Sequence, residues 1–110
     1  MNELSNSVVD AAFAVHKELG PGLLESVYEV CLCRELSIRN VPFRSQVLLP
    51  VTYKGLRLDE GLRLDLLVAD SIIVELKSVQ RIEPVFEAQL LSYLKLTGLR
   101  LGLLINFMFL

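Results

Sequence analysis

The sequence contains little of what zinc sites and disulfide frameworks are built from. It has one histidine, two cysteines and no tryptophan in 110 residues. Cys31 and Cys33 lie two residues apart in a segment with helical periodicity, and side chains at that spacing do not share a helix face. Because only His16 could assist them, we expect no zinc site and interpret both cysteines as free thiols, as in a reducing compartment.

Long hydrophobic runs and a secretory leader are also missing. No apolar run approaches the roughly 18–20 residues that cross a bilayer, although 53% of the residues are hydrophobic. Residues 1–7 do not combine a basic segment with a following apolar one, so no signal peptide is expected. We therefore expect a cytoplasmic protein with no membrane partner.

Charge of one sign is not in excess either. The chain carries 11 lysines and arginines against 13 acidic residues, a net charge of −2, and it has no basic tail. This balance argues against long-range attraction of nucleic acid, while local contacts by single basic side chains stay open. The length is typical of one domain, here residues 1–110. So high a hydrophobic content on so small a domain predicts a homodimer or a larger homo-oligomer.

Periodicity and turn residues predict an α/β protein with the element order α-α-β-β-β-α-β. Apolar residues spaced three and four apart indicate helices, and alternating or continuous apolar runs indicate strands. The last run is apolar enough for a strand buried on both faces beside a parallel neighbour. Turns are expected at residues 54–55 and 59–61. The expected helices cover residues 6 or 7–19, about 23–38 and 84–97, and the expected strands cover 43–53, 64–68, 72–76 and 101–109.

The hairpin of residues 64–76 carries the strongest functional signal, and we expect it at the centre of a mixed sheet flanked by helices. Each of its apolar runs contains a carboxylate, Asp65 in the first and Glu75 in the second. If residues 69–71 form a three-residue loop, these carboxylates face each other about 4.5–5.5 Å apart at Cβ, close enough to share one divalent cation. A two-residue turn would put them on opposite faces of the sheet.

Lys77 lies two residues after Glu75, so both side chains point to one face of the second strand. The alternative interpretation of Asp65, Glu75 and Lys77 is an ion-pair cluster at a sheet edge, which contributes little to stability. Spacing alone favours neither interpretation. Glu25, in the first turn of the second expected helix, is by itself best explained as a complement to the helix dipole.

Several blocks of residues follow one another in a set order. They are Gly22-Leu-Leu-Glu25-Ser-Val-Tyr28, Arg63-Leu-Asp65, Glu75-Leu76-Lys77, Gln89-Leu-Leu-Ser-Tyr93-Leu and Ile105-Asn106-Phe107. This set resembles the GxxExxY protein family, which belongs to the PD-(D/E)XK nuclease superfamily. The Asp…Glu-x-Lys spacing is weakly specific alone, but the ordered set spans nearly the whole chain. One position departs from the superfamily pattern: Leu64 stands where a proline precedes the aspartate.

The resemblance implies a restriction-endonuclease-like α/β core and hydrolysis of DNA phosphodiester bonds with Mg²⁺ or Mn²⁺. The implied catalytic residues are Asp65, Glu75, Lys77, Glu25 and Gln89. The implied metal ligands are Asp65, Glu75, Glu25 and the backbone carbonyl of Leu76, with Tyr93, Tyr28 and Asn106 in supporting positions. We also expect the side chain of Glu25 to point toward Asp65 rather than into solvent.

Three functions stay open on the sequence. The first is a Mg²⁺-dependent nuclease whose partner is DNA. The second is a catalytically weak nuclease-fold module that binds nucleic acid or a protein partner, and the third is a structural homo-oligomer with a vestigial site. The intact set of Asp65, Glu75 and Lys77 favours the first, whereas the acidic charge balance and the small size favour the others.

Overall fold

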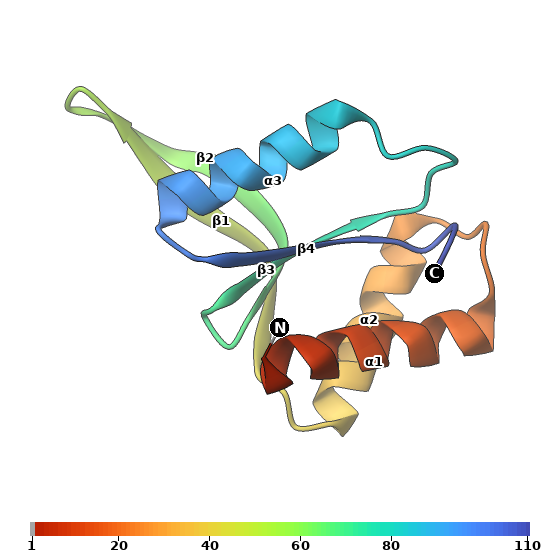
Figure 1. Ribbon diagram of the computed structural model, residues 1–110. Coiled ribbons are helices and arrows are strands. Elements are labelled where there is room, and N and C mark those ends of the chain that lie inside the picture. The colour runs from red at the N-terminus through yellow and green to blue at the C-terminus, as the bar shows by residue number, and fades with distance from the viewer. Residues whose placement is uncertain (1) are drawn as a thin grey trace.

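The computed structural model describes residues 2–110. The elements are α1 (Glu3–Leu19), α2 (Glu25–Ile38), β1 (Phe43–Tyr53), β2 (Leu56–Val68), β3 (Ile72–Lys77), α3 (Pro84–Thr97) and β4 (Leu101–Asn106). Their order is the one expected from the sequence. Figure 1 shows α3 on one side of the sheet and the pair α1 and α2 on the other. None of the described helices is long and apolar enough to cross a membrane.

The four strands form one mixed sheet in the order β1-β2-β3-β4. β2 is antiparallel to both β1 and β3, and β4 is parallel to β3, so the mixed sheet with a central hairpin is confirmed. The expected burial of the last strand on both faces is wrong. β4 lies at the edge of the sheet and only Ile105 within it is buried, whereas β3, one strand further in, is buried from Ile72 to Leu76.

The alternation of side chains along β3 divides the core into two layers. Ile72 and Val74 pack in a cluster with α1 and α2, while Ile73 packs in a second cluster with Leu90 of α3. Because side chains alternate across a strand, the odd-numbered residues of β3 lie on the α3 face. Glu75 therefore follows Ile73 on that face, beneath α3 rather than beneath α1.

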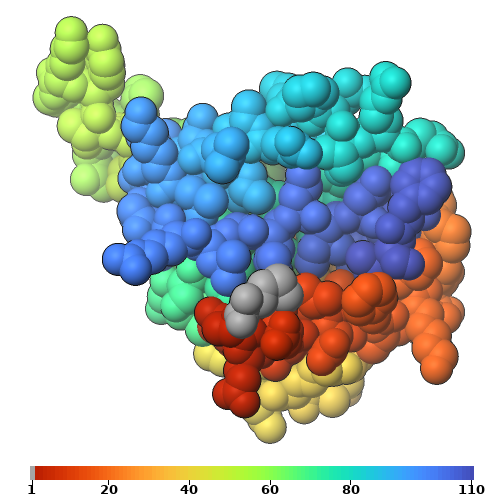
Figure 2. Space-filling view, in the orientation of Figure 1, coloured from red at the N-terminus to blue at the C-terminus, as the bar shows by residue number. Residues whose placement is uncertain are grey.

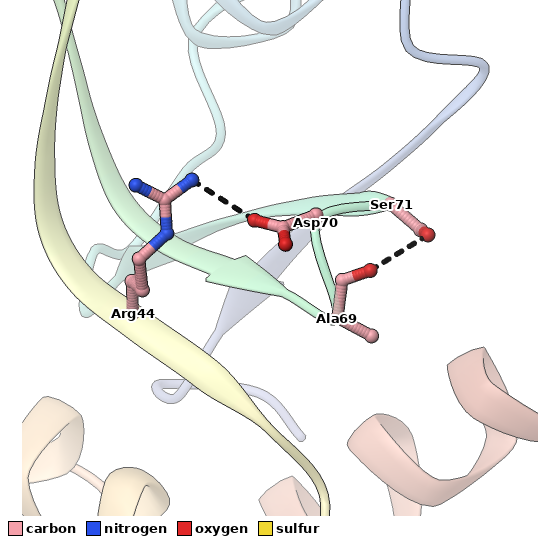
Figure 3. A network of polar contacts seen from close by, with 4 residues as sticks. All are labelled: Arg44, Ala69, Asp70 and Ser71. Carbon is pink, nitrogen blue, oxygen red and sulfur yellow. Dashed lines mark hydrogen bonds and ion pairs between the residues drawn. The ribbon is translucent and has the colours of Figure 1, made fainter.

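The loop between β2 and β3 fixes how these two strands are aligned. Ala69 and Asp70 both have left-handed backbones, with φ of 51° and 52°, and Val68 pairs directly with Ile72. Figure 3 shows Asp70 accepting a hydrogen bond from Arg44 of β1 at 2.9 Å, and Ser71 Oγ donating to the Ala69 carbonyl at 2.9 Å. The expected three-residue loop is confirmed, and with it the alignment that sets the carboxylates face to face.

The hairpin of β1 and β2 is longer than the sequence indicates. Its far end projects from the body of the molecule, as the yellow-green tip in Figures 1 and 2 shows. The turn expected at residues 59–61 is wrong, because β2 runs through them without a break. The pairing with β1 shifts between Leu49 and Val51, and Gly61 lies opposite that irregularity. A Cβ at Gly61 would approach Val51 Cγ2 to 2.6 Å, so the glycine marks close strand contact and not a turn.

The two N-terminal helices begin at residues that the sequence did not indicate. α1 begins at Glu3, ahead of the expected caps, because Asn2 caps it. The Asn2 side chain accepts a hydrogen bond from Ser5 N at 2.7 Å, and the Asn2 N–H donates to Ser5 Oγ at 3.1 Å. α2 begins at Glu25, shortly after the expected start, and Glu25 lies in its first turn as expected.

Gly102 of β4 determines how closely α3 approaches the sheet. A Cβ at this position would lie 2.7 Å from Leu90 Cδ1 and 3.0 Å from Leu90 Cγ. We expect Gly102→Val to push α3 away from the sheet and to lower the free energy of unfolding by about 1–3 kcal/mol, because added methyl groups overpack a filled contact. Urea denaturation measures this loss.

The matched control is the same substitution in a Leu90→Ala background. Truncation of Leu90 removes the clashing atoms, so Gly102→Val should then destabilise less than it does alone. Equal losses in the two backgrounds would mean that this contact does not set the position of α3.

Candidate functional site

Asp65 and Glu75 face each other across the inner pair of strands, on the same face of the sheet. The recorded backbone pairing of β2 with β3 ends at Leu66 and Val74. At the next position, Asp65 and Glu75, the carboxylate side chains accept hydrogen bonds from backbone N–H groups. The Asp65 N–H donates to Glu75 Oε2 at 2.9 Å, and the Leu76 N–H donates to Asp65 Oδ2 at 2.8 Å. Each carboxylate is thus held by the backbone of the opposite strand.

The two carboxylates open into a cavity of about 560 Å³ between the sheet, α2 and α3. Its lining comes from five elements that are far apart in the sequence. Among the site residues expected from the sequence, seven line it: Glu25, Asp65, Glu75, Leu76, Lys77, Gln89 and Tyr93. Four more line it to which the sequence assigned no role: Ser26, Glu29, Gln46 and Arg63.

Glu75 is the most buried charged group of the cavity, with 6% of its surface exposed. Burial is the largest cause that raises the pKa of Glu75, and the neighbouring Asp65 carboxyl adds to it, so that the net pKa moves from its ordinary 4.5 to about 8. The hydrogen bond from the Asp65 backbone and the positive charge of Lys77 act in the opposite direction. The result is a carboxylate whose negative charge is poorly compensated by the groups around it.

Lys77 lies on the same strand face as Glu75 and is half-buried. Its ammonium sits over the ring of Phe86, with Nζ 4.3 Å from the ring centroid, a distance typical of a cation–π contact. Within residues 2–110 it makes no ion pair with a carboxylate. Phe86 belongs to the first turns of α3, so this helix positions the lysine as well as Gln89 and Tyr93.

Gln89 and Tyr93 lie one turn apart on α3 and reach the cavity from above the sheet. Burial raises the pKa of the Tyr93 hydroxyl, and the charges of Glu75 and Asp65 raise it further, while the backbone of Arg63 lowers it. The phenol therefore stays protonated and neutral beside the two carboxyl groups. It can act there as a hydrogen-bond donor.

Glu25 lines the cavity together with Asp65, but it is an exposed residue at the rim. Glu29, one helical turn later, lies deeper. Burial raises the pKa of Glu29, its hydrogen bond with Gln46 lowers it, and the charge of Asp65 raises it. A signal for Glu29 existed in the sequence, because residues four apart on a helix share a face and Glu25 had already been singled out.

Tyr28 and Asn106 do not line the cavity. The Tyr28 ring is fully buried and stacks on Phe107 at a centroid distance of 4.4 Å, and its hydroxyl donates to the Gly20 carbonyl. The Asn106 amide exchanges hydrogen bonds with the backbone of Val79, at 2.9 and 3.0 Å. Tyr28 thus secures the loop before α2, and Asn106 secures the segment that follows Lys77.

The donor set of the cavity fits a hard divalent cation. No group of three or more His, Cys, Asp or Glu side chains in the described part of the chain has the arrangement of a metal cage. Mg²⁺, however, is commonly bound by only one or two carboxylates and completes its shell with water and phosphate oxygens. Asp65 and Glu75 each commit one oxygen to a backbone N–H, which leaves their other oxygens for a cation.

Comparison with protein families gives a match over nearly the whole described chain. The model of the PD-(D/E)XK nuclease superfamily matches residues 2–109. Comparison with curated proteins and with solved structures gave no significant match. The helices and the mixed sheet described above agree with the nuclease-like fold of that superfamily.

The raised pKa of Glu75 makes stability depend on pH when no metal is present. Between pH 4.5 and about 8 the folded state holds a proton on Glu75 that the unfolded state has lost. The free energy of unfolding should therefore fall as pH rises through this range, by at most about 1.4 kcal/mol per pH unit from this group. Urea denaturation in the presence of a chelator, at about pH 5, 6, 7 and 8, measures the slope of the free energy of unfolding against pH.

Glu75→Gln isolates the contribution of this group. The amide does not ionise, yet its oxygen can still accept the Asp65 N–H, so the variant should lose most of the pH slope and exceed the wild type in stability near pH 8. Glu60→Gln, on an exposed part of β2, serves as the control. A slope that is the same in Glu75→Gln and wild type would show that Glu75 is ionised in the folded protein.

Proposed function

The chain belongs to the PD-(D/E)XK nuclease superfamily, and on that premise we propose that it is a Mg²⁺- or Mn²⁺-dependent nuclease that hydrolyses DNA phosphodiester bonds. The observation that carries the proposal is the meeting of Asp65, Glu75 and Lys77 on one face of the central hairpin, inside a cavity. A surface ion-pair cluster does not account for it, because Glu75 is buried and Lys77 makes no ion pair within residues 2–110.

The cation would be held by Asp65, Glu75 and the Leu76 carbonyl, with Glu25 at the rim as an outer carboxylate. When bound, it supplies positive charge to the phosphate oxygens and lowers the pKa of a nearby water. The proton on Glu75 must leave before that oxygen can serve as a ligand, so binding releases a proton and weakens as pH falls.

The other residues act on the phosphate and the attacking water. Lys77 donates hydrogen bonds to the developing negative charge once its ammonium leaves the ring of Phe86, because an ammonium has donors and no acceptor. Gln89 reaches the cavity from α3 and orients the water or a phosphate oxygen, and Tyr93 supports it.

A second candidate is a catalytically weak nuclease-fold module that binds nucleic acid or a protein partner. One observation favours it: the Lys77 ammonium is directed to Phe86 rather than to the carboxylates. A lysine held in this position would leave binding intact and slow the chemistry. The third candidate is a structural homo-oligomer, and the exposed apolar side chains described below support it.

Three finer assignments are part of the proposal. We place the chain in the GxxExxY family, as a single nuclease-like domain over residues 1–110. We also propose a cytoplasmic location, which two free cysteines support, since Cys31 and Cys33 form no disulfide. Reaction with a thiol reagent in cell extracts would test the reduced state.

Substitutions in the cavity should separate metal binding from chemistry. Asp65→Ala and Glu75→Ala should abolish both cleavage of supercoiled DNA and the rise in melting temperature with Mg²⁺, since each removes a ligand. Lys77→Ala should reduce cleavage by about 100-fold or more while it keeps the melting-temperature rise, because an ammonium is not a ligand. Gln89→Ala should slow cleavage with little change in metal affinity.

Lys77→Ala against wild type, each with Mg²⁺ and with chelator, is the decisive comparison. Equal nicking by the two proteins would identify the activity as a contaminant. Metal-induced stabilisation without any cleavage by the wild type would replace the nuclease proposal with the weak binding module.

Self-association is proposed from exposed apolar side chains. Leu91 and Leu96 on α3 are 66% and 55% exposed, and Tyr53 and Leu56 at the projecting hairpin end are 63% and 61% exposed. Apolar groups gathered on a small domain commonly mark an interface. Light scattering at high micromolar concentration should give a homodimer or larger, and a monomer at that concentration would contradict the proposal.

A further inference from the structure

Arg63 lies in the cavity without a carboxylate partner. It precedes Asp65 by two residues on β2, so both side chains lie on the same face of the strand, roughly 7 Å apart along it. Four carboxylates line this cavity, yet within residues 2–110 Arg63 forms no ion pair with any of them. Its Nε instead donates to Gln46 Oε1 at 2.6 Å.

Gln46 is held at both ends of its side-chain amide. Its Oε1 accepts from Arg63, and its Nε2 donates to Glu29 Oε1 at 2.6 Å. Arginine only donates and a carboxylate only accepts, so the orientation of the amide is fixed by its two partners. The amide therefore stands between the guanidinium of Arg63 and the carboxylate of Glu29.

The backbone at Gln46 is unusual as well. Its φ of 50° lies in the left-handed region, which residues other than glycine seldom adopt. It sits between Ser45 and Val47, whose partners on β2 are Leu66 and Leu64, so Asp65 is the residue across from it. Uncommon backbone conformations of this kind concentrate at functional sites. Here the Gln46 side chain lines the same cavity as Asp65.

We infer that Arg63 binds a nucleic-acid backbone phosphate beside the reacting one, and that Gln46 is the positioning residue that aims its guanidinium. The inference rests on the proposed nuclease function and deepens it. With Nε directed to Gln46, the terminal N–H groups form a planar fork that matches two phosphate oxygens. Arg63 is exposed, so a phosphate can reach it from solvent.

The charge balance of the cavity makes Arg63 important for binding a phosphate. Glu25, Glu29 and Asp65 repel a phosphate, and Arg63 and Lys77 are the basic residues of the lining. The Lys77 ammonium is directed to Phe86, which leaves Arg63 as the cation at the mouth. Gln46 leaves the positive charge of Arg63 available to a ligand. It donates a hydrogen bond to the Glu29 carboxylate and is itself uncharged.

The test measures binding of a fluorescent DNA duplex over a series of salt concentrations, with Ca²⁺ in place of Mg²⁺ to suppress cleavage. Arg63→Gln should weaken binding about tenfold at low salt and reduce the slope of log Kd against log salt by about 1, the change expected for one lost phosphate contact. Arg44→Gln is the matched control. Arg44 lies on β1 and pairs with Asp70 at the loop shown in Figure 3, outside the cavity.

The role of Gln46 is tested through Arg63. Gln46→Ala should weaken binding in the wild-type background and have little further effect in the Arg63→Gln background, because it acts only by aiming the guanidinium. Gln46→Glu should also weaken binding, since its carboxylate pairs with Arg63. A purely structural role for Gln46 would lower the melting temperature and would weaken binding equally in both backgrounds.

Each outcome decides one question. An unchanged salt slope in Arg63→Gln, additive effects of Arg63 and Gln46, or no duplex binding by the wild type would overturn the inference. The predicted slope change together with absence of cleavage in Mg²⁺ would support it while overturning the proposed nuclease activity. Melting temperatures of all variants, whose altered side chains are exposed, verify that the fold is retained.

Discussion

The rest of this site depends on two carboxylates, Asp65 and Glu75, that face each other across β2 and β3. A buried carboxylate is costly unless hydrogen bonds or an opposite charge compensate it, and Glu75 is 6% exposed. The chain compensates in part. The backbone pairing of β2 with β3 ends at Leu66 and Val74, and each carboxylate then accepts a hydrogen bond from a backbone N–H of the opposite strand. The uncompensated part is reflected in the pKa of Glu75, which burial and the neighbouring Asp65 carboxyl together raise to about 8.

The carboxylate pair was predictable because it depends on local rules. A three-residue loop at 69–71 and the alternation of side chains along a strand are enough to place Asp65 opposite Glu75 and Lys77 beside it. The start of α3 at Pro84 follows just as locally from the missing N–H of proline. None of these inferences required knowledge of which elements pack together.

Glu29 and Gln46 show where such rules end. Gln46 meets the carboxylates because β1 pairs with β2, and Glu29 meets them because α2 docks beside the sheet, where Tyr28 stacks on Phe107. No local pattern announces that contact or the left-handed backbone of Gln46. The turn expected at 59–61 failed for a related reason. Its residues have turn composition, but they lie at the irregularity of a strand that continues, because Leu58 and Leu62 on either side of them pair with β1.

The proposed role of a cation agrees with the arrangement of these side chains, independently of any family resemblance. A protein can compensate buried carboxylates with its own lysines and arginines, and this cavity contains one of each. Neither forms an ion pair with them in the described chain: Lys77 lies over Phe86, and Arg63 is bound to an uncharged amide. The cavity thus has carboxyl groups without an ion-pair partner on its floor and a directed positive charge at its mouth. On the proposed function, a divalent cation would bind at the first and a phosphate at the second, and a nucleic acid with its counterions would bring both.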